Sequence, residues 1–183
     1  MPGKSTTRSA DRRRRQSGLT LVETMATLAV AAILLTAAVP PMQDFIVRNR
    51  MSTEVNTFMA SLYLARSEAV KRLQDVSLCP TTDGASCDIT TPLPQLWQEG
   101  WMVYVDADND NTYSAGDIVI QRNPKLPDRF TNIPYNAKFI TFNPRGSSNG
   151  DSFTFTDTEG VAESRCVTLS SVGRSYTQLG ACT

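Results

Sequence analysis

Residues 18–39 read GLTLVETMATLAVAAILLTAAV, and this stretch determines how the rest of the chain is organised. Glu23 is the only charged side chain between Leu19 and Val39. About 20 predominantly apolar residues in a helix are enough to span the hydrocarbon core of a bilayer. The stretch therefore predicts a transmembrane helix over residues 19–39.

The distribution of charge predicts the orientation of that helix. The chain has 183 residues, with 18 Lys and Arg against 18 Asp and Glu. Residues 1–18 hold six basic residues and one acidic residue, a net charge of +5, which leaves −5 for residues 19–183. Because basic residues beside a span stay in the cytoplasm, we expect residues 1–18 there and the rest of the chain beyond the inner membrane.

Three kinds of segment share this pattern: a secretory signal peptide, a plain membrane anchor and a filament-subunit leader. Glu23 disfavours the signal peptide because a charge weakens its apolar region, and Thr36 fits poorly before a cleavage site at Ala38. A lone carboxylate at membrane depth costs about 3 kcal/mol, which favours pairing with a cation. The alternative is that Glu23 reaches the membrane interface and stays hydrated.

The residues from Gly18 to Glu23 resemble the prepilin-peptidase site of type IV pilins and type II secretion pseudopilins. The resemblance implies cleavage between Gly18 and Leu19, loss of residues 1–18 as a leader, and methylation of Leu19. Glu23, the fifth residue of the mature chain, is then expected to pair with the Leu19 amine of a neighbouring subunit. Leu19 departs from the phenylalanine that is usual at the first mature position.

Residues 40–75 are expected to continue the helix as an amphipathic segment. Pro40-Pro41 predicts a kink or a local break. Beyond it, apolar residues recur at steps of three and four, which predicts one stripe that is buried against a β-sheet. The stripe comprises Met51, Val55, Phe58, Leu62, Ala65, Ala69 and Leu73.

Residues 61–72, SLYLARSEAVKR, resemble the signature of the GspH/FimT group of minor pilins. The resemblance implies an α+β pilin fold, in which a long N-terminal helix packs on antiparallel β-sheet. It also implies a structural, non-enzymatic protein: a minor pilin of a type IV pilus or of its tip or initiation complex. A type II secretion minor pseudopilin and a DNA-binding minor pilin for natural transformation are the alternatives. Expected partners are other minor pilins, the major pilin, prepilin peptidase and the inner membrane.

Residues 76–183 are expected to form a β-rich periplasmic head domain. Short alternating runs separated by Gly, Pro, Asn and Asp are typical of antiparallel strands. In residues 152–157 the alternation places Phe153 and Phe155 on the inner face, whereas the unbroken apolar centre of residues 117–121 predicts a strand covered on both faces. The expected strands are 100–106, 117–122, 138–143, 152–157, 165–170 and 173–178.

The chain has no histidine and four cysteines, none with C-x-x-C spacing. Histidine-dependent hydrolysis is therefore excluded and a zinc site is disfavoured. An exported domain with an even number of cysteines is expected to form disulfides. Three connectivities are open, and we favour Cys79–Cys87 with Cys166–Cys182 because each pair closes a local loop.

Residues 106–117 follow the ligand spacing of a calcium-binding EF-hand loop. The candidate ligands are Asp106, Asp108, Asp110, Thr112 and Asp117. Asn stands at the sixth position in place of Gly, and Asp117 stands in place of the bidentate Glu. The alternative is an Asx-rich turn that forms without metal, because Asx side chains cap their own backbone. Apart from this calcium ion, no cofactor is expected.

Residues 173–176, Gly-Arg-Ser-Tyr, resemble half of the Gly-Arg-x-Arg element of DNA-binding FimT-type pilins. Arg174 would be the DNA contact, but Tyr176 stands where the second arginine is expected. The net charge of −5 after residue 18 also disfavours binding to phosphate backbones. We therefore expect no nucleic-acid partner, and Arg174 is more simply explained as a turn residue.

Overall fold

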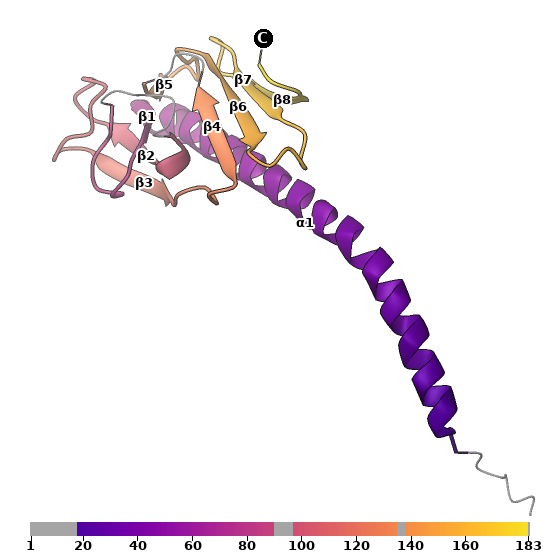
Figure 1. The fold of residues 1–183 in the computed structure, drawn as a ribbon. Helices are drawn as coiled ribbons and strands as arrows, with labels where there is room; N and C mark the ends of the chain where they lie inside the picture. The colour runs from indigo at the N-terminus through magenta and orange to yellow at the C-terminus, as the bar shows by residue number, and fades with distance from the viewer. Residues whose placement is uncertain (1–17, 90–96, 135–137, 183) are drawn as a thin grey trace, which may run out of the picture. The chain divides into compact units, whose positions relative to one another are not determined.

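The computed structural model describes residues 18–89, 97–134 and 138–182. The basic residues of the expected leader fall within residues 1–17 and lie outside this description. The chain divides into two compact units, residues 1–40 and 41–183, and the division falls between Pro40 and Pro41, although the helix itself continues through both prolines. One helix, α1 (Leu21–Arg72), precedes the strands (Figure 1).

The described residues form eight strands after α1 (Figure 1). Six of them correspond to the expected strands within a few residues. Their bounds are β1 Asp75–Pro80, β2 Trp101–Asp106, β3 Ile118–Asn123, β4 Phe130–Pro134, β5 Ile140–Phe142, β6 Asp151–Asp157, β7 Arg165–Leu169 and β8 Ser175–Leu179.

The first unit contains the N-terminal part of α1. Thr20 caps the helix, because its Oγ1 accepts a hydrogen bond from the Glu23 backbone N–H at 3.2 Å. All side chains from Leu21 to Thr36 are exposed. Among the described residues, no single helix is both long and apolar enough to span a membrane. Two segments of α1, Leu21–Thr36 and Pro41–Arg72, reach the required length and hydropathy when they are taken together as a bent pair.

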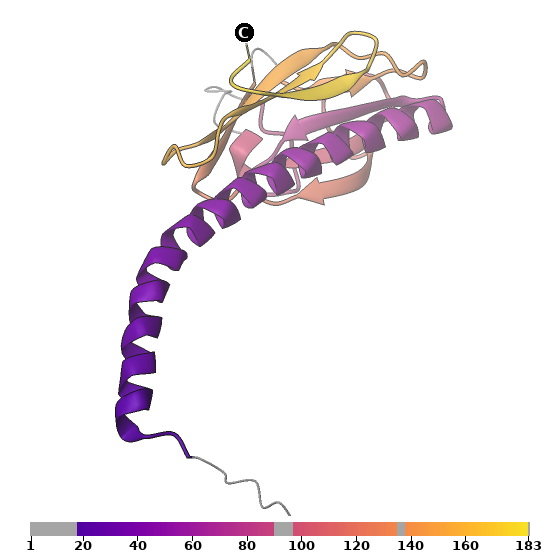
Figure 2. The same cartoon turned by 90° about the vertical axis from the view of Figure 1, so that its right-hand side faces the viewer.

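The second unit holds two antiparallel sheets and the C-terminal part of α1, which lies against them (Figure 2). Sheet A has the strand order β3-β2-β1-β5, and sheet B has the order β4-β6-β7-β8. Sequence patterns missed β1 and β4. Both end in proline, and β4 carries the buried polar residue Asn132.

Two sequence predictions about burial are wrong. Ile118 of β3 is 55% exposed because β3 is an edge strand of sheet A, so residues 117–121 are not covered on both faces. Leu73 is 73% exposed because α1 ends at Arg72, and Leu73 adopts a left-handed φ of 55° that turns the chain into β1. The stripe therefore stops one step earlier than its period predicts.

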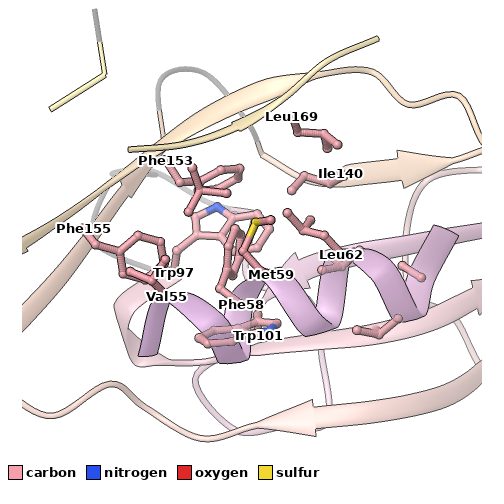
Figure 3. Packing of buried hydrophobic residues seen from close by; sticks show 14 of the residues in the cluster. Val55, Phe58, Met59, Leu62, Trp97, Trp101, Ile140, Phe153, Phe155 and Leu169 are labelled. Carbon is pink, nitrogen blue, oxygen red and sulfur yellow. The ribbon is translucent and has the colours of Figure 1, made fainter. Parts of the chain in front are cut away.

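The rest of the predicted α1 stripe forms the centre of the core. Its members from Met51 to Ala69 are each at most 1% exposed. Phe58 packs against rings from both sheets, with centroid distances of 5.3 Å to Trp101 and 4.7 Å to Phe153 (Figure 3). The predicted inward Phe153 and Phe155 are both fully buried. The stripe therefore supplies the apolar layer that the two sheets share.

Polar side chains of α1 fix the helix to the strands. Ser61 is fully buried, and its Oγ accepts hydrogen bonds from Trp101 Nε1 at 3.0 Å and Asn123 Nδ2 at 3.3 Å. Arg66 donates to the Gly146 carbonyl at 3.0 Å and to the Val172 carbonyl at 3.3 Å. One guanidinium thus holds two turns, that of residues 143–146 and the β7–β8 turn.

Gly173 allows those two turns to meet. Its φ is +74°, and a Cβ built there would overlap the carbonyl oxygen of Gly146 and approach Arg66 Nε. Only glycine fits this conformation and this close approach without strain. The glycine of the predicted Gly-Arg element is therefore explained by packing.

The structure contains the two disulfides that we favoured because each closes a local loop, Cys79–Cys87 and Cys166–Cys182. The Cα atoms of Cys79 and Cys87 are 5.6 Å apart, and those of Cys166 and Cys182 are 5.0 Å apart. The first closes the loop after β1, and the second ties the C-terminal segment to β7. Cross-links of this kind stabilise the folded state mainly by restricting the unfolded chain.

Asp157 organises the β6–β7 turn. Its fully buried carboxylate accepts hydrogen bonds from Arg129 Nε at 2.7 Å and from the backbone N–H groups of Val161 and Ala162, each at 2.8 Å. Arg129 also pairs with Glu159 at 2.9 Å. The hydrogen bond from Arg129, with those from the backbone, holds the pKa of Asp157 well below its usual range.

Gly173→Ala tests the packing of the turns. We expect it to lower the free energy of unfolding by about 3 kcal/mol, part from the left-handed backbone and part from overlap with Gly146. Gly160 is the matched control, because its φ is +73° and no atom lies within 4 Å of a Cβ built there. Gly160→Ala should cost only about 1 kcal/mol in urea unfolding of residues 41–183. An equal decrease in the free energy of unfolding in both variants would show that the overlap with the Gly146 carbonyl oxygen does not contribute.

Asp157→Asn tests the buried ion pair through pH. Because folding depresses the pKa of Asp157, its contribution is present above its unfolded pKa of about 3.9 and is lost as the pH falls below that value. The variant should be less stable than the wild type at pH 7, and the difference should shrink toward pH 3. Urea unfolding at both pH values measures this, and a difference that grows on acidification would contradict it.

Candidate functional site

The predicted processing site lies in an accessible, non-helical stretch. Gly18, Leu19 and Thr20 precede the helix, and Leu19 is 75% exposed. A Cβ built on Gly18 would meet no atom within 4 Å. The Gly18–Leu19 bond therefore lies outside the helix and between two exposed residues.

Glu23 lies at one end of an apolar helix face. It shares a shallow depression on α1 with small and apolar side chains, namely Ala26, Thr27, Val30, Ala31 and Leu34. Small residues let a second helix approach closely, which is the packing that helices use in apolar surroundings. The face therefore combines a packing surface with a single carboxylate.

The surface around this face is apolar and exposed. Side chains from Leu21 to Leu35 that are large and hydrophobic are 57–78% exposed. Soluble monomers rarely expose a continuous apolar surface of this kind. This part of α1 consequently needs a membrane or other apolar helices around it.

The second candidate site is the loop that joins β2 to β3. Asp106 closes β2 and is 1% exposed, and Asp117 stands directly before β3. Oxygens of Asp106, Asp108 and Asp117 lie within 4.8 Å of one another. Asp110 lies outside this group. Its Oδ1 accepts a hydrogen bond from the Thr112 N–H at 2.7 Å, so it shapes the turn.

Backbone donors orient the two carboxylates at the base of the loop. Asp106 accepts hydrogen bonds from the N–H groups of Asp110 at 3.2 Å and Asn111 at 2.9 Å. Asp117 accepts them from Ala107 at 2.9 Å and Ser114 at 2.7 Å. Burial raises the pKa of Asp106, and the backbone hydrogen bonds oppose that effect. Of the four aspartates among the predicted calcium ligands, the structure thus brings three together, whereas ligation by Thr112 stays a prediction.

Sequence reasoning missed how this loop is attached to the sheet. Asn111 adopts a left-handed φ of 59°, and its Oδ1 accepts a hydrogen bond from Thr141 Oγ1 of β5 at 3.0 Å. Thr141 Oγ1 also lies 2.7 Å from Ser77 Oγ of β1. These contacts join residues far apart in the chain, so no local pattern predicts them.

Arg174 lies in the β7–β8 turn. Its carbonyl accepts a hydrogen bond from the Ser170 N–H at 2.9 Å, and its own N–H donates to Ser170 Oγ at 3.2 Å. The residue is exposed. The backbone of Arg174 therefore closes the turn through its hydrogen bonds with Ser170. A DNA contact through the Arg174 side chain stays a prediction.

Two parts of the chain match families of known proteins. Residues 54–173 match the family described as type II transport protein GspH. Residues 13–39 match the prokaryotic N-terminal methylation motif, which includes Gly18, Leu19 and Glu23. No curated protein sequence matches the chain.

Two kinds of solved structure share the fold. The type IV minor pilin FimU of Pseudomonas aeruginosa is 19% identical with a TM-score of 0.53, covering 73% of this chain and 92% of its own. The minor pseudopilin EpsH of the Vibrio cholerae type 2 secretion system is 11% identical with a TM-score of 0.51, covering 71% and 97%. With the family match over most of residues 41–183, the chain belongs to the GspH family and is a structural protein of the minor pilin and pseudopilin class.

Proposed function

We propose that this protein is a minor subunit of a type IV pilus or of its tip or initiation complex. Prepilin peptidase cuts between Gly18 and Leu19, and the new amine of Leu19 is methylated. The observation that supports this most is the methylation motif over residues 13–39, placed on a helix whose side chains from Leu21 to Thr36 are all exposed. Such a helix suits the inner membrane first and the neighbouring helices of a filament later.

The proposed location is a single pass through the inner membrane, with residues 41–183 in the periplasm. The +5 charge of residues 1–18 favours a cytoplasmic N-terminus. The two disulfides of the second unit suit an oxidising compartment. The periplasmic unit then presents its surface to other pilins.

Glu23 is proposed to pair with the Leu19 amine of a neighbouring subunit. From residue 19 onward, the first basic side chain of the chain is Arg48, far along the helix from Glu23. A carboxylate in apolar surroundings is costly without a cation close by. Cleavage would create such a cation at the start of each subunit, four residues from its own Glu23. Pairing across subunits would then set the register of the helices in the filament.

A minor pseudopilin of a type II secretion system is the second candidate function. The description of the matching family favours it. Both assemblies would use the same processing site and the same helix face. The phenotype of a strain that lacks the gene therefore separates the two candidates.

The role of Glu23 is tested by complementing that strain. The wild-type gene should restore surface pili, whereas Glu23→Gln should restore at most about a tenth, because an amide cannot form the ion pair. Gln costs less than Glu inside a bilayer, so the variant should still reach the membrane. Immunoblots of sheared pili measure the amount of surface pili, and immunoblots of the membrane fraction measure the amount of the variant that reaches the membrane.

Thr27→Ala is the matched control for that experiment. Thr27 lies one turn from Glu23 in the same depression and is polar but uncharged, so its variant should restore pili fully. Full restoration by Glu23→Gln would refute the pairing role. A strain that keeps its pili but stops type II secretion would replace the pilus proposal with the pseudopilin.

A further inference from the structure

A pocket opens in the second unit where α1 meets the β8 edge of sheet B. Its volume is about 240 Å³. Met51 and Ala162 belong to the buried core, whereas Leu179 is 61% exposed. The lining comprises Arg48 and Met51 of α1, Ala162 and Glu163 of the β6–β7 turn, Arg165 of β7 and Leu179 of β8.

The backbone around the pocket is held in place by the fold. Arg165 lies directly opposite Leu179 in the register of β7 and β8, so both side chains leave sheet B on the same face. The N–H of Ala162 donates to the buried Asp157 carboxylate at 2.8 Å, which fixes the turn next to Glu163. The pocket is therefore built from one helix, one anchored turn and two paired strands.

The charged side chains of the pocket are not paired with one another. Two are arginines and one is a glutamate, and none of the ion pairs among the described residues includes Arg48, Glu163 or Arg165. Each guanidinium offers five N–H donors in a planar fork, and the carboxylate only accepts. The pocket therefore presents donors for an anion and acceptors for a cation side by side.

Along the chain, the pocket lies close to the segment that is expected to span the membrane. Arg48 follows Val39 by nine residues, which is about 14 Å along a helix. Between them, Met42, Phe45 and Ile46 are 41–59% exposed although they are large and hydrophobic. Exposed apolar side chains followed by arginine are typical of a segment at a membrane surface, where a guanidinium reaches lipid phosphates.

We propose that this pocket binds the headgroup of a membrane phospholipid that carries a primary amine beside its phosphate, as phosphatidylethanolamine does. The phosphate lies between Arg48 and Arg165, because guanidinium and phosphate form strong charge-assisted hydrogen bonds. Glu163 accepts hydrogen bonds from the amine and repels a headgroup that carries only negative charge. The proposal rests on the inner-membrane location given under Proposed function, and the contact would hold the head domain at the membrane surface until the subunit enters a filament.

Lipid binding is measured by native mass spectrometry of the full chain in maltoside micelles, titrated with phosphatidylethanolamine. We expect one bound lipid. Its affinity should exceed that of phosphatidylglycerol with the same acyl chains by about threefold or more, because only the amine can pair with Glu163. Absence of binding, or equal or stronger binding of phosphatidylglycerol, would overturn the proposal. Displacement of the lipid by an equal concentration of inorganic phosphate would assign the pocket to a free anion and would also overturn it.

A double variant, Arg48→Gln with Arg165→Gln, locates the phosphate. It should bind phosphatidylethanolamine at least about tenfold more weakly, because two charge-assisted contacts are lost. Its unfolding temperature should match that of the wild type, since neither side chain is paired or belongs to the core. The matched control is Arg145→Gln with Arg174→Gln, which removes the same charge from two exposed arginines outside the pocket. Equal affinities of the two double variants would refute the site.

Glu163→Gln tests the position of the amine. This variant should still bind phospholipid but should lose the preference for phosphatidylethanolamine over phosphatidylglycerol. A preference of wild-type size would refute the assigned orientation of the headgroup. Fractionation of the host separates this inference from the proposed function: a chain that is in the membrane fraction but binds no lipid in the pocket would overturn this inference alone, whereas a chain absent from that fraction would refute the proposed location.

Discussion

The fold depends on the insertion of Phe58 of α1 between two antiparallel sheets. Its ring contacts Trp101 of sheet A and Phe153 of sheet B, and burying a side chain of this size is worth about 3 kcal/mol. Once the helix lies in this layer, Ser61 and Arg66 reach the strands and turns at fixed positions. The close approach of the two turns that Arg66 holds then requires glycine at their meeting point. Packing by one helical stripe thus determines where the polar contacts form.

The two parts of α1 have opposite relations to solvent, and this difference links the fold to function. From Met51 to Ala69, one stripe of the helix is buried against the sheets. From Leu21 to Thr36, every side chain is exposed although most are apolar. The core of the second unit includes buried side chains from this second part of α1 only, among the residues that the structure describes. The first part remains available for a membrane and for other subunits, and Glu23 is the only charge that it carries.

The sequence predicts those features that have a regular period. The α1 stripe as far as Ala69 and the inward Phe153 and Phe155 follow from helical and strand periodicity. Periodicity does not predict burial correctly where the end of a helix or the position of a strand in its sheet determines exposure. Leu73 fits the stripe but lies beyond the end of the helix, and the apolar β3 is half exposed because it is an edge strand. In the β2–β3 loop, spacing alone could not predict that Asp110 lies outside the group of three carboxylates, or that Asn111 is bonded to Thr141 of β5.

In the proposed function, the working protein begins at Leu19, with its apolar helix and Glu23 next to a new amine. The intact mass of the protein extracted from membranes of its own host tests this most directly. We expect the mass of residues 19–183 with two disulfides and one additional methyl group on the N-terminal amine. The mass of a chain that retains residues 1–18, or of one cut near Ala38 and lacking Glu23, would show that cleavage does not occur between Gly18 and Leu19.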